Sequence, residues 1–593
     1  MGSSYQLQQQ AIDAEIRSLE GSIRALKLRR NTFAPISSLP NEVIAIIFSF
    51  LRARVTLFAI KPGKKPDGLA WLRVAHVCHQ WREIALNQPH FWSHVDFTAV
   101  SSAGAAEILS RAKTVPLHLE VGAPVGLWDD ARFGPFQKEL QDRVPHICRL
   151  AISAEPFHLH RILKGLIMPA PTLEFLSLAS ENDHRGGAAF VPDSLFDGST
   201  PRLSSLELWN CDISWMSPLL GSLKHLEIRS PFKWPSLSVW LDALDQMPQL
   251  KTLALHRASP VAPWGLIPSE VERAVTLPSL THFEVSSPAR YCGFALAHLI
   301  LPALTSLCVV AESSRRDYSD VQEILTFVSR HAHGPQDSRP LQSVLVRSNG
   351  MGVEIVAWTS PDVHVELSEQ ISVSDARHSG RVSFSITNSD DWSPRVDTGT
   401  LSAVMEALPL DGLVTFTAQN RFNRQFWLWH APKWPLLRHV RLTPAAERGF
   451  REMLMEDNKR RGGPLLPLLK TLVLVDVALL ERRNLRLCDA LTKRVEQGVP
   501  LETLDLRKCL ATGHAIELLS KIVVDVLAPE KTYETGSDLV SEAGARLIYV
   551  EDEYSEVEDY DEDDADTGSD DEVQDMDGDT SSDIYGEGEA VYW

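Results

Sequence analysis

The densest group of histidine and cysteine side chains that could bind a metal ion lies near position 78 of the 593-residue chain. His76, Cys78 and His79 occur within four positions, and imidazole and thiolate groups are the ligands that zinc prefers. On a helix these three positions point in different directions, so we do not expect them to converge on an ion. The seven cysteines are scattered and never spaced as C-x-x-C, which indicates buried thiols in a reducing compartment and not a zinc site or a disulfide framework.

Motifs that carry catalysis or cofactor binding are absent from the sequence. It contains no phosphate-binding G-x-x-x-x-G-K-[ST], no dinucleotide-binding glycine fingerprint, no H-E-x-x-H and no G-x-S-x-G. We therefore predict no catalytic residue, no metal site and no cofactor, in a protein that binds partners and is not an enzyme. An enzyme with a cryptic site in the body of the chain is the disfavoured alternative.

The stretch SSLPNEVIAIIF at residues 37–48 predicts a helix with almost no polar side. Pro40 suits the first turn of a helix, where its missing N–H costs nothing. From Val43 to Leu51, seven of nine residues are large and apolar, and a helix that is apolar nearly all round must be covered on more than one side. The cover is either the rest of this chain or a partner, and the pattern alone leaves both open.

A second helix is predicted after the loop FAIKPGKKPDG at residues 58–68, whose Pro, Gly and Lys content breaks regular structure. Val74, Cys78, Trp81 and Ala85 recur at spacings of four, three and four, which makes one apolar stripe. The following NQPHFW at residues 87–92 adds aromatic surface. A module of this size has only a marginal core of its own.

Together these two stretches resemble an F-box. The first half-motif is Leu39-Pro40-x-Glu42-Val43-x-x-Ile46-x-Phe48-x-x-Leu51, and the second is Val77-Cys78-x-x-Trp81-Arg82-x-x-Ala85 followed by Pro89-x-Phe91-Trp92. The resemblance implies a small helical module at 35–95 that docks on the Skp adaptor of Skp–cullin–F-box ubiquitin ligases. By matched position, the expected Skp-binding residues are Leu39, Pro40, Ile44, Ile47, Phe48, Leu51, Val77, Cys78, Trp81 and Trp92. We expect about half of them to touch the adaptor and the others to be internal core.

The body at 100–530 carries a degenerate repeat. A unit P-x-Φ-x-x-Φ-x-Φ, where Φ is apolar, begins at Pro145, Pro171, Pro201, Pro248, Pro278, Pro302, Pro435 and Pro467, and variants occur at 222–228, 340–346 and 500–506. Alternation at the end of each unit predicts a short strand, and the residues between units have helical spacing. This resembles a leucine-rich repeat, whose units stack into a solenoid, with Cys211 and Cys509 at its Asn/Cys position.

Parts of the body depart from this pattern. The stretch at about 311–400 is irregular, and its β-like runs VEIVAW, VHVEL and RVSFSIT are either irregular repeats or an inserted hairpin. The alternative to a repeat solenoid is that the whole body is an ordinary α/β domain in which a proline precedes each strand. The tryptophan-rich RQFWLWHAPKWP at 424–435 is more often core in such a fold, so Trp427 and Trp429 are only a weak candidate for a ligand site.

Two other segments have apolar patterns. Ile12, Ile16, Leu19, Ile23 and Leu26 are spaced four, three, four and three, which predicts an amphipathic, coiled-coil-like helix over 5–31 that either dimerises or, the favoured reading, lies on the body. Residues 292–311 carry no formal charge over twenty positions. Pro302 and the repeat register indicate a buried helix end followed by a strand there, and not a membrane span.

The acidic surplus of the chain is confined to its last residues. Of 78 acidic residues, 20 lie in 551–593, which leaves 58 against 58 basic residues elsewhere. A neutral body gives no reason to expect nucleic-acid binding, and the tail is expected to be disordered. Ser555, Thr567, Ser569 and Thr580 each precede an acidic residue by three positions, a context that resembles acidophilic-kinase sites. Because the first residues lack a signal-peptide pattern, we expect a cytoplasmic or nuclear protein.

The sequence therefore predicts an α/β chain with an F-box, an irregular leucine-rich-repeat solenoid and an acidic tail. The family resemblance implies a substrate-recognition subunit of an Skp–cullin–F-box ligase, which binds the Skp adaptor, through it a cullin, and an unknown protein substrate. The alternative is a scaffold whose F-box binds a partner without directing ubiquitin transfer. No nucleic acid and no membrane are expected as partners.

Overall fold

The computed structural model describes most of the first 534 residues. The described ranges are 2–58, 70–97, 100, 102–122, 130–181, 189–260, 273–313, 321–332, 340–348, 352–361, 381–388, 398–419, 422–456, 463–479 and 481–534. The chain divides into two compact units, Met1–Glu534 and Thr535–Trp593, and every described residue lies in the first. The predicted tail at 551–593, with its four candidate phosphorylation sites, lies outside the described residues.

The N-terminal part is helical, but the single helix predicted through Val74, Cys78, Trp81 and Ala85 is interrupted. A 3-10 turn ends at His76, and the backbone is extended at Cys78, whose sulfur caps a separate α-helix that begins at His79. The elements of this part are α1 (Gly2–Asn31), η1 (Pro35–Ser38), α2 (Asn41–Phe58), η2 (Ala70–His76), α3 (His79–Asn87) and η3 (Pro89–Trp92). Most of the lysine-bearing loop between α2 and η2 lies outside the described residues. A short strand, β1 (His94–Asp96), follows and pairs with the first strand of the body, β2 (Leu117–Gly122), so the helices lead directly into the sheet.

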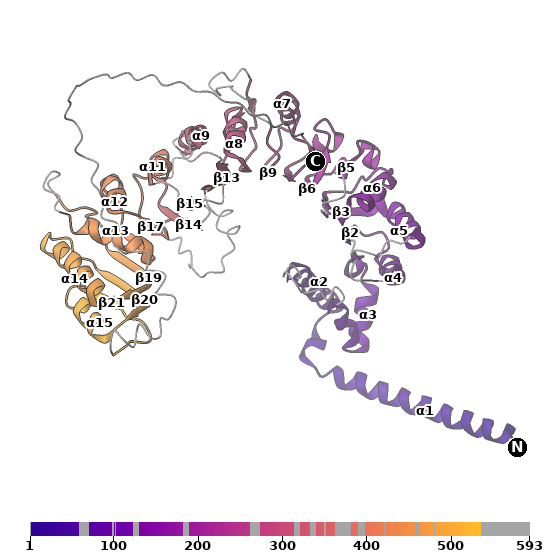
Figure 1. Cartoon of the computed structure of the whole chain (residues 1–593). Coiled ribbons are helices and arrows are strands. Elements are labelled where there is room, and N and C mark those ends of the chain that lie inside the picture. The colour runs from indigo at the N-terminus through magenta and orange to yellow at the C-terminus, as the bar shows by residue number, and fades with distance from the viewer. Residues whose placement is uncertain are drawn as a thin grey trace, which may run out of the picture. The chain divides into compact units, whose positions relative to one another are not determined.

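The body is built on a sheet of seventeen strands, most of them parallel (Figure 1). The strands after β1 are β2 (Leu117–Gly122), β3 (Ile147–Ala154), β4 (Phe175–Ser180), β6 (Ser205–Trp209), β8 (His225–Arg229), β9 (Thr252–His256), β11 (His282–Pro288), β13 (Ser306–Ser313), β14 (Ser343–Ser348), β15 (Gly352–Trp358), β16 (Val382–Asn388), β17 (Thr415–Ala418), β18 (His439–Leu442), β19 (Thr471–Leu479), β20 (Thr503–Ala511) and β21 (Asp525–Leu527). Smaller parallel pairs join β5 (Ala189–Val191) to β7 (Cys211–Ile213) and β10 (Val275–Thr276) to β12 (Leu299–Ile300).

Neighbouring strands of the sheet follow the order of the chain, with one exception. From β1 to β13, and again from β17 to β21, each strand pairs in parallel with the next strand of the main sheet. All eleven predicted repeat units and variants lie at strands; for example, the unit that begins at Pro201 leads into β6. The expectation of a mixed α/β chain with a strand in each unit is thus confirmed.

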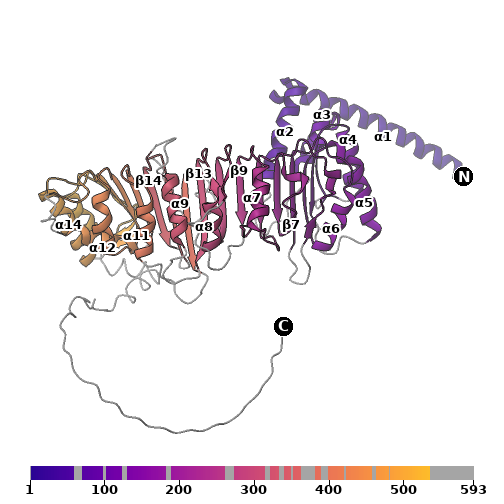
Figure 2. The ribbon, with the colours of Figure 1, turned by 90° about the horizontal axis from the view of Figure 1, so that it is seen from above.

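Helices connect many of the strands and follow one side of the sheet (Figure 2). They are α4 (Ser102–Ala112), α5 (Asp130–Arg143), α6 (Pro156–Gly165), α7 (Leu237–Asp245), α8 (Ala289–Ala297), α9 (Gln322–Ala332), α11 (Thr398–Ala407), α12 (Arg424–His430), α13 (Pro444–Leu454), α14 (Glu481–Glu496) and α15 (Gly513–Ser520), with short 3-10 turns η4 (Val144–His146), η5 (Leu195–Gly198), η6 (Pro218–Leu220) and η8 (Ala431–Lys433). In β6, Leu206 and Leu208 are fully buried while Ser205 and Glu207 are half-buried, so alternate residues form the core.

The irregular region of the sequence corresponds to the exception in strand order. VEIVAW lies in β15 and RVSFSIT overlaps β16, whereas VHVEL lies outside the described residues. β15 runs antiparallel to both β14 and β16, and the spatial order is β13-β16-β15-β14-β17. The chain thus places three strands in the sheet in reversed order before parallel pairing resumes.

The uncharged segment at 292–311 spans the end of α8, the short β12 and part of β13. Cys292 and Leu307 are fully buried there, and Pro302 lies between β12 and β13. In the part of the chain that the structure describes, no helix combines the length and the hydropathy that spanning a bilayer requires.

Candidate functional site

The N-terminal helical module has a small core made mainly of aromatic rings. The Phe48 ring of α2 lies 5.2 Å from the Trp81 ring of α3 and 5.9 Å from the Phe91 ring of η3, measured between centroids. Trp71 of η2 meets Phe91 edge to face at 4.7 Å. Such edge-to-face pairs stabilise a core beyond the area that they bury, which suits a module too small for a large aliphatic core.

Trp92 joins this aromatic core to the body. Its indole Nε1 donates a 2.7 Å hydrogen bond to the carbonyl oxygen of Ala85, and its side chain is buried. The guanidinium of Arg111, on α4, lies 4.8 Å from the centre of the Trp92 ring. The buried residues of the module share one continuous core cluster with most of the buried residues of the sheet.

Local interactions explain where the two main helices begin. The carbonyl oxygen of Pro40 accepts the first backbone hydrogen bonds of α2, from the N–H groups of Val43 and Ile44. The Cys78 sulfur caps α3 by accepting a bond from the backbone N–H of Trp81, with a sulfur–nitrogen distance of 3.5 Å. Cys78 therefore has a structural role in this fold.

An apolar stripe on α2 is exposed in the part of the chain that the structure describes. Val43, Ile46 and Phe50, which we call the α2 stripe, lie at i, i+3 and i+7 and are 38%, 56% and 70% exposed. Ile44 and Phe48 lie on the adjacent side of the same helix and are 0% and 1% exposed. The helix is therefore apolar on two sides because one side packs on its own module and the other faces outward.

The structure divides nine of the ten predicted Skp-binding residues into three groups. Pro40 and Val77 are exposed; Leu39, Ile47, Cys78 and Trp81 are half-buried; and Ile44, Phe48 and Trp92 are buried inside the module. Leu51 lies in α2, but its side chain is outside the described residues. The three members of the α2 stripe were not among the ten, although their spacing of three and four residues was a signal that could have found them.

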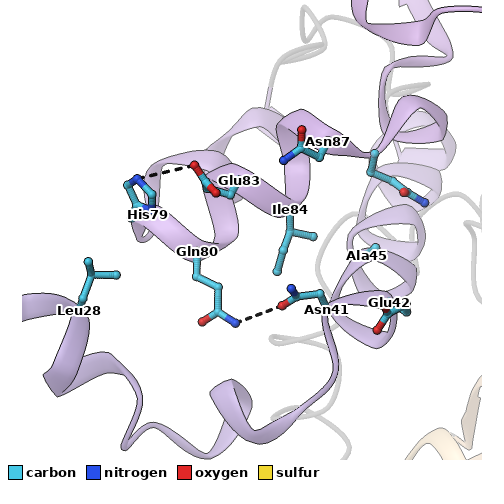
Figure 3. A pocket seen from close by; sticks show the side chains of 10 residues that line it. Leu28, Asn41, Glu42, Ala45, His79, Gln80, Glu83, Ile84 and Asn87 are labelled. Atoms are coloured by element: carbon cyan, nitrogen blue, oxygen red, sulfur yellow. Dashed lines mark hydrogen bonds and ion pairs between the residues drawn. The ribbon is translucent and has the colours of Figure 1, made fainter.

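A polar hollow of about 430 Å³ lies where α1, α2 and α3 approach one another (Figure 3). Gln80 Nε2 donates to Asn41 Oδ1 over 3.2 Å, and His79 Nε2 lies 3.7 Å from Glu83 Oε1. Leu28 of α1 and Ile84 of α3 are apolar members of its wall. No three His, Cys, Asp or Glu side chains among the described residues are grouped to hold a metal ion, and this includes the cluster around Cys78.

The two tryptophans considered as a ligand site have different environments. Trp427 is fully buried, with its ring 5.3 Å from the Phe416 ring and 4.8 Å from the Phe450 ring, so it belongs to the core of the body. Trp429 is 56% exposed, and its Nε1 donates to Glu406 Oε1 over 2.7 Å. The structure therefore does not bring the two side chains together into one site.

Comparison with known families identifies the helical module. Residues 36–98 match the sequence model of the F-box-like family, so the F-box part of the predicted resemblance is confirmed. An F-box-like domain indicates a role as a ubiquitin-ligase adaptor or in protein interaction, and such domains generally bind the Skp adaptor. The match covers about a tenth of the chain.

Comparisons of the whole chain are less informative. No curated protein sequence matches it. Among the solved structures that match is a crystal structure of a TLR13–ssRNA13 complex, with 13% identity and a TM-score of 0.28 over 73% of this chain and 48% of that one. This chain thus spans about half the length of that protein.

Proposed function

We propose that this protein, which carries an F-box-like domain at residues 36–98, is a substrate-recognition subunit of an Skp–cullin–F-box ubiquitin ligase. The F-box binds the Skp adaptor and, through it, a cullin, while the body binds a protein substrate. The chemistry of ubiquitin transfer belongs to other subunits, so this chain is not itself an enzyme. It acts in the cytoplasm or the nucleus.

The observation that carries the proposal is the exposed α2 stripe. When a module already has a well-packed core, an exposed row of large apolar side chains on it is typical of a surface that a partner protein covers. Pro40 and Val77, which the F-box resemblance also selects, are exposed on the same module. The buried Ile44, Phe48 and Trp92 hold this surface in shape from inside.

The body suits substrate binding if it is a leucine-rich-repeat solenoid. From β1 to β13 and from β17 to β21, successive strands of the main sheet pair in parallel, and a left-handed backbone conformation recurs directly after β6, β8 and β9, at Asn210, Ser230 and Arg257. The Cys211 thiol lies 3.7 Å from the carbonyl oxygen of Leu178 in β4, and the Cys509 thiol lies 3.2 Å from that of Leu474 in the paired strand β19. Burial raises the pKa of both thiols to about 12, which fits a structural role.

Binding to purified Skp adaptor tests the first half of the proposal. The wild-type chain should form a stoichiometric complex in a pull-down, and the Ile46→Ser/Phe50→Ser variant should lose it while its circular dichroism spectrum stays unchanged. The matched control is Ile167→Ser/Phe157→Ser, which removes an equally exposed Ile and Phe from the body. Equal loss in both variants, or no binding by folded wild type, would overturn the adaptor role.

Reconstitution with the cullin, the RING subunit and the ubiquitin-conjugating enzyme tests the second half. A ligase subunit should direct ubiquitin onto proteins that co-purify with the body, and the α2-stripe variant should not. Skp binding without transfer to any bound protein would favour the alternative, a non-ligase scaffold.

A further inference from the structure

The longest helix that the structure describes, α1, presents an exposed apolar seam. Ile12, Ile16, Leu19, Ile23 and Leu26 alternate at spacings of four and three, so they occupy the a and d positions of a heptad repeat. Each is between 47% and 66% exposed. The sequence by itself favours a helix that lies on the body. The exposure of the seam shows that the seam does not pack on the body in this structure.

The side of α1 that approaches the F-box-like module is not the seam. Leu28 occupies an f position of the same heptad, on the side of the helix away from a and d, and it lines the hollow beside α3 (Figure 3). The contact with the module thus leaves the seam open to another molecule.

The charges of α1 are divided along its length. Between residues 13 and 20 the helix carries Asp13, Glu15 and Glu20 with Arg17, whereas residues 24–30 carry four basic side chains and no acidic one. A helix that is acidic in one half and basic in the other complements a second copy of itself that runs in the opposite direction.

We propose that α1 pairs with α1 of a second copy of this chain as an antiparallel coiled coil. In the register that stacks Ile16 on Leu26 of the second copy, and Leu19 on Ile23, four apolar layers form. That register places Asp13 (position e) against Lys27 and Glu15 (position g) against Arg29 of the second copy, and each pair occurs twice. Glu20 and the uncharged Ser22 each meet their own equivalent, so Glu20 is the one like-charge contact at e and g.

Other arrangements fit the charges less well. In a parallel pair, Glu15 faces Glu20 of the second copy twice, and no e or g position gains an opposite charge. An antiparallel pair shifted by one heptad in one direction places Asp13 against Glu20 twice. The opposite shift pairs Glu20 with Lys27 but keeps only the two apolar layers of Ile23 on Leu26. The charges and the number of apolar layers together therefore select the orientation and the register.

The arrangement has a consequence for the proposed function. Residue 31 of one copy lies level with residue 11 of the other, so the C-terminal ends of the two helices are about 30 Å apart along the axis at 1.5 Å per residue. The two F-box-like modules therefore leave the pair at opposite ends, which lets each one bind its partner without competing for space. The helical overlap spans residues 11–31 of each copy, about three heptads, and contains only four apolar layers, so the dimer should dissociate on dilution.

The experiment measures the mass of the full-length protein by sedimentation equilibrium over a range of concentrations. Wild type should show a concentration-dependent dimer, and Ile16→Asp/Ile23→Asp should remain monomeric. The matched control, Ser18→Asp/Ala25→Asp, adds the same charges at positions outside the seam and should still dimerise. A monomeric wild type throughout, or equal loss of the dimer in both variants, would overturn the proposal.

Two charge-swap variants test the orientation. Asp13→Lys/Glu15→Arg and Lys27→Asp/Arg29→Glu should each lose the homodimer, because like charges then face each other, and mixing them should restore a heterodimer with all four pairs attractive. In a parallel dimer, Asp13→Lys/Glu15→Arg would instead strengthen its own homodimer, since the arginine introduced at position 15 would face Glu20. Because neither variant alters the α2 stripe, Skp binding should be unaffected, so failure here is distinguishable from failure of the adaptor role.

Discussion

In the parallel sheet, leucines two residues apart turn to the same side and are fully buried, as Leu206 and Leu208 of β6 show. In α2 of the F-box-like module, apolar residues occur on two sides, and Ile46 and Phe50 stay exposed while Ile44 and Phe48 are enclosed. In the body, these apolar side chains are buried and stabilise its own fold. The module uses half of its apolar surface for that purpose and leaves the other half for a partner, so substitutions in the two regions should differ in kind.

The largest effect is expected in the core of the body. Trp427→Ala should destabilise the protein by about 3–5 kcal/mol, because a fully buried indole packed on Phe416 and Phe450 is replaced by a cavity. Chemical denaturation would measure the loss. The control Trp429→Ala, whose side chain is exposed, should change stability by less than about 1 kcal/mol. Equal losses would mean that Trp429 is also part of the core.

A buried ion pair on α13 should come next. Arg451 Nε lies 2.7 Å from Glu447 Oε1, and the two side chains are 7% and 2% exposed. Arg451→Met should cost about 3 kcal/mol, since it leaves the Glu447 carboxylate buried without its partner. Arg448→Met, which breaks the exposed pair with Glu452 one turn away, should cost less than about 1 kcal/mol. Denaturant midpoints of the two variants would compare them directly.

Acid should destabilise the body through His430. Burial, together with the charge of Lys433, lowers the pKa of His430 to about 4, from an ordinary value of 6.5. The folded state therefore binds fewer protons than the unfolded state, so this contribution is complete above pH 6.5 and is lost as the pH falls toward 4, by up to about 3 kcal/mol. Stability measured against pH should flatten in this window for His430→Phe, which keeps a ring against Trp434. An unchanged slope would assign the acid sensitivity to other groups.

The smallest effect on stability is expected at the α2 stripe. Ile46→Ser/Phe50→Ser should change the unfolding free energy by less than about 1 kcal/mol, because both side chains are more than half exposed in the folded chain. The same variant should nevertheless lose Skp binding. A large loss of stability would instead show that the stripe packs within this chain and would remove the difference between the two regions.

Much of the fold could be predicted because its signals are local. Alternation with a period of two located the strands, such as β6 after Pro201. The spacing of Val74, Cys78 and Trp81 located a helical region but not its interruption at Cys78, because the extended backbone there is stabilised by the cap that the sulfur makes to α3. The reversed order of β14, β15 and β16 could not be predicted, because strand pairing joins residues far apart in the chain and the two readings of VEIVAW and RVSFSIT have the same local pattern.

The candidate site could also be predicted only in part, because only some of its signals are local. The half-motifs located the F-box-like module, and the residues that match them are defined by the sequence alone. Motif positions do not separate a core residue such as Phe48 from a surface residue such as Val77, since both roles require a large apolar side chain.

The sequence by itself determined the helical module, the repeated strands, the heptad seam of α1 and the charge division along that helix, because each depends on residue types at fixed short spacings. Only the tertiary structure decided which side of α2 is covered, which of Trp427 and Trp429 is buried, and that the seam of α1 is open. Those outcomes depend on what packs against each side chain, and the neighbours that decide it come from distant parts of the chain.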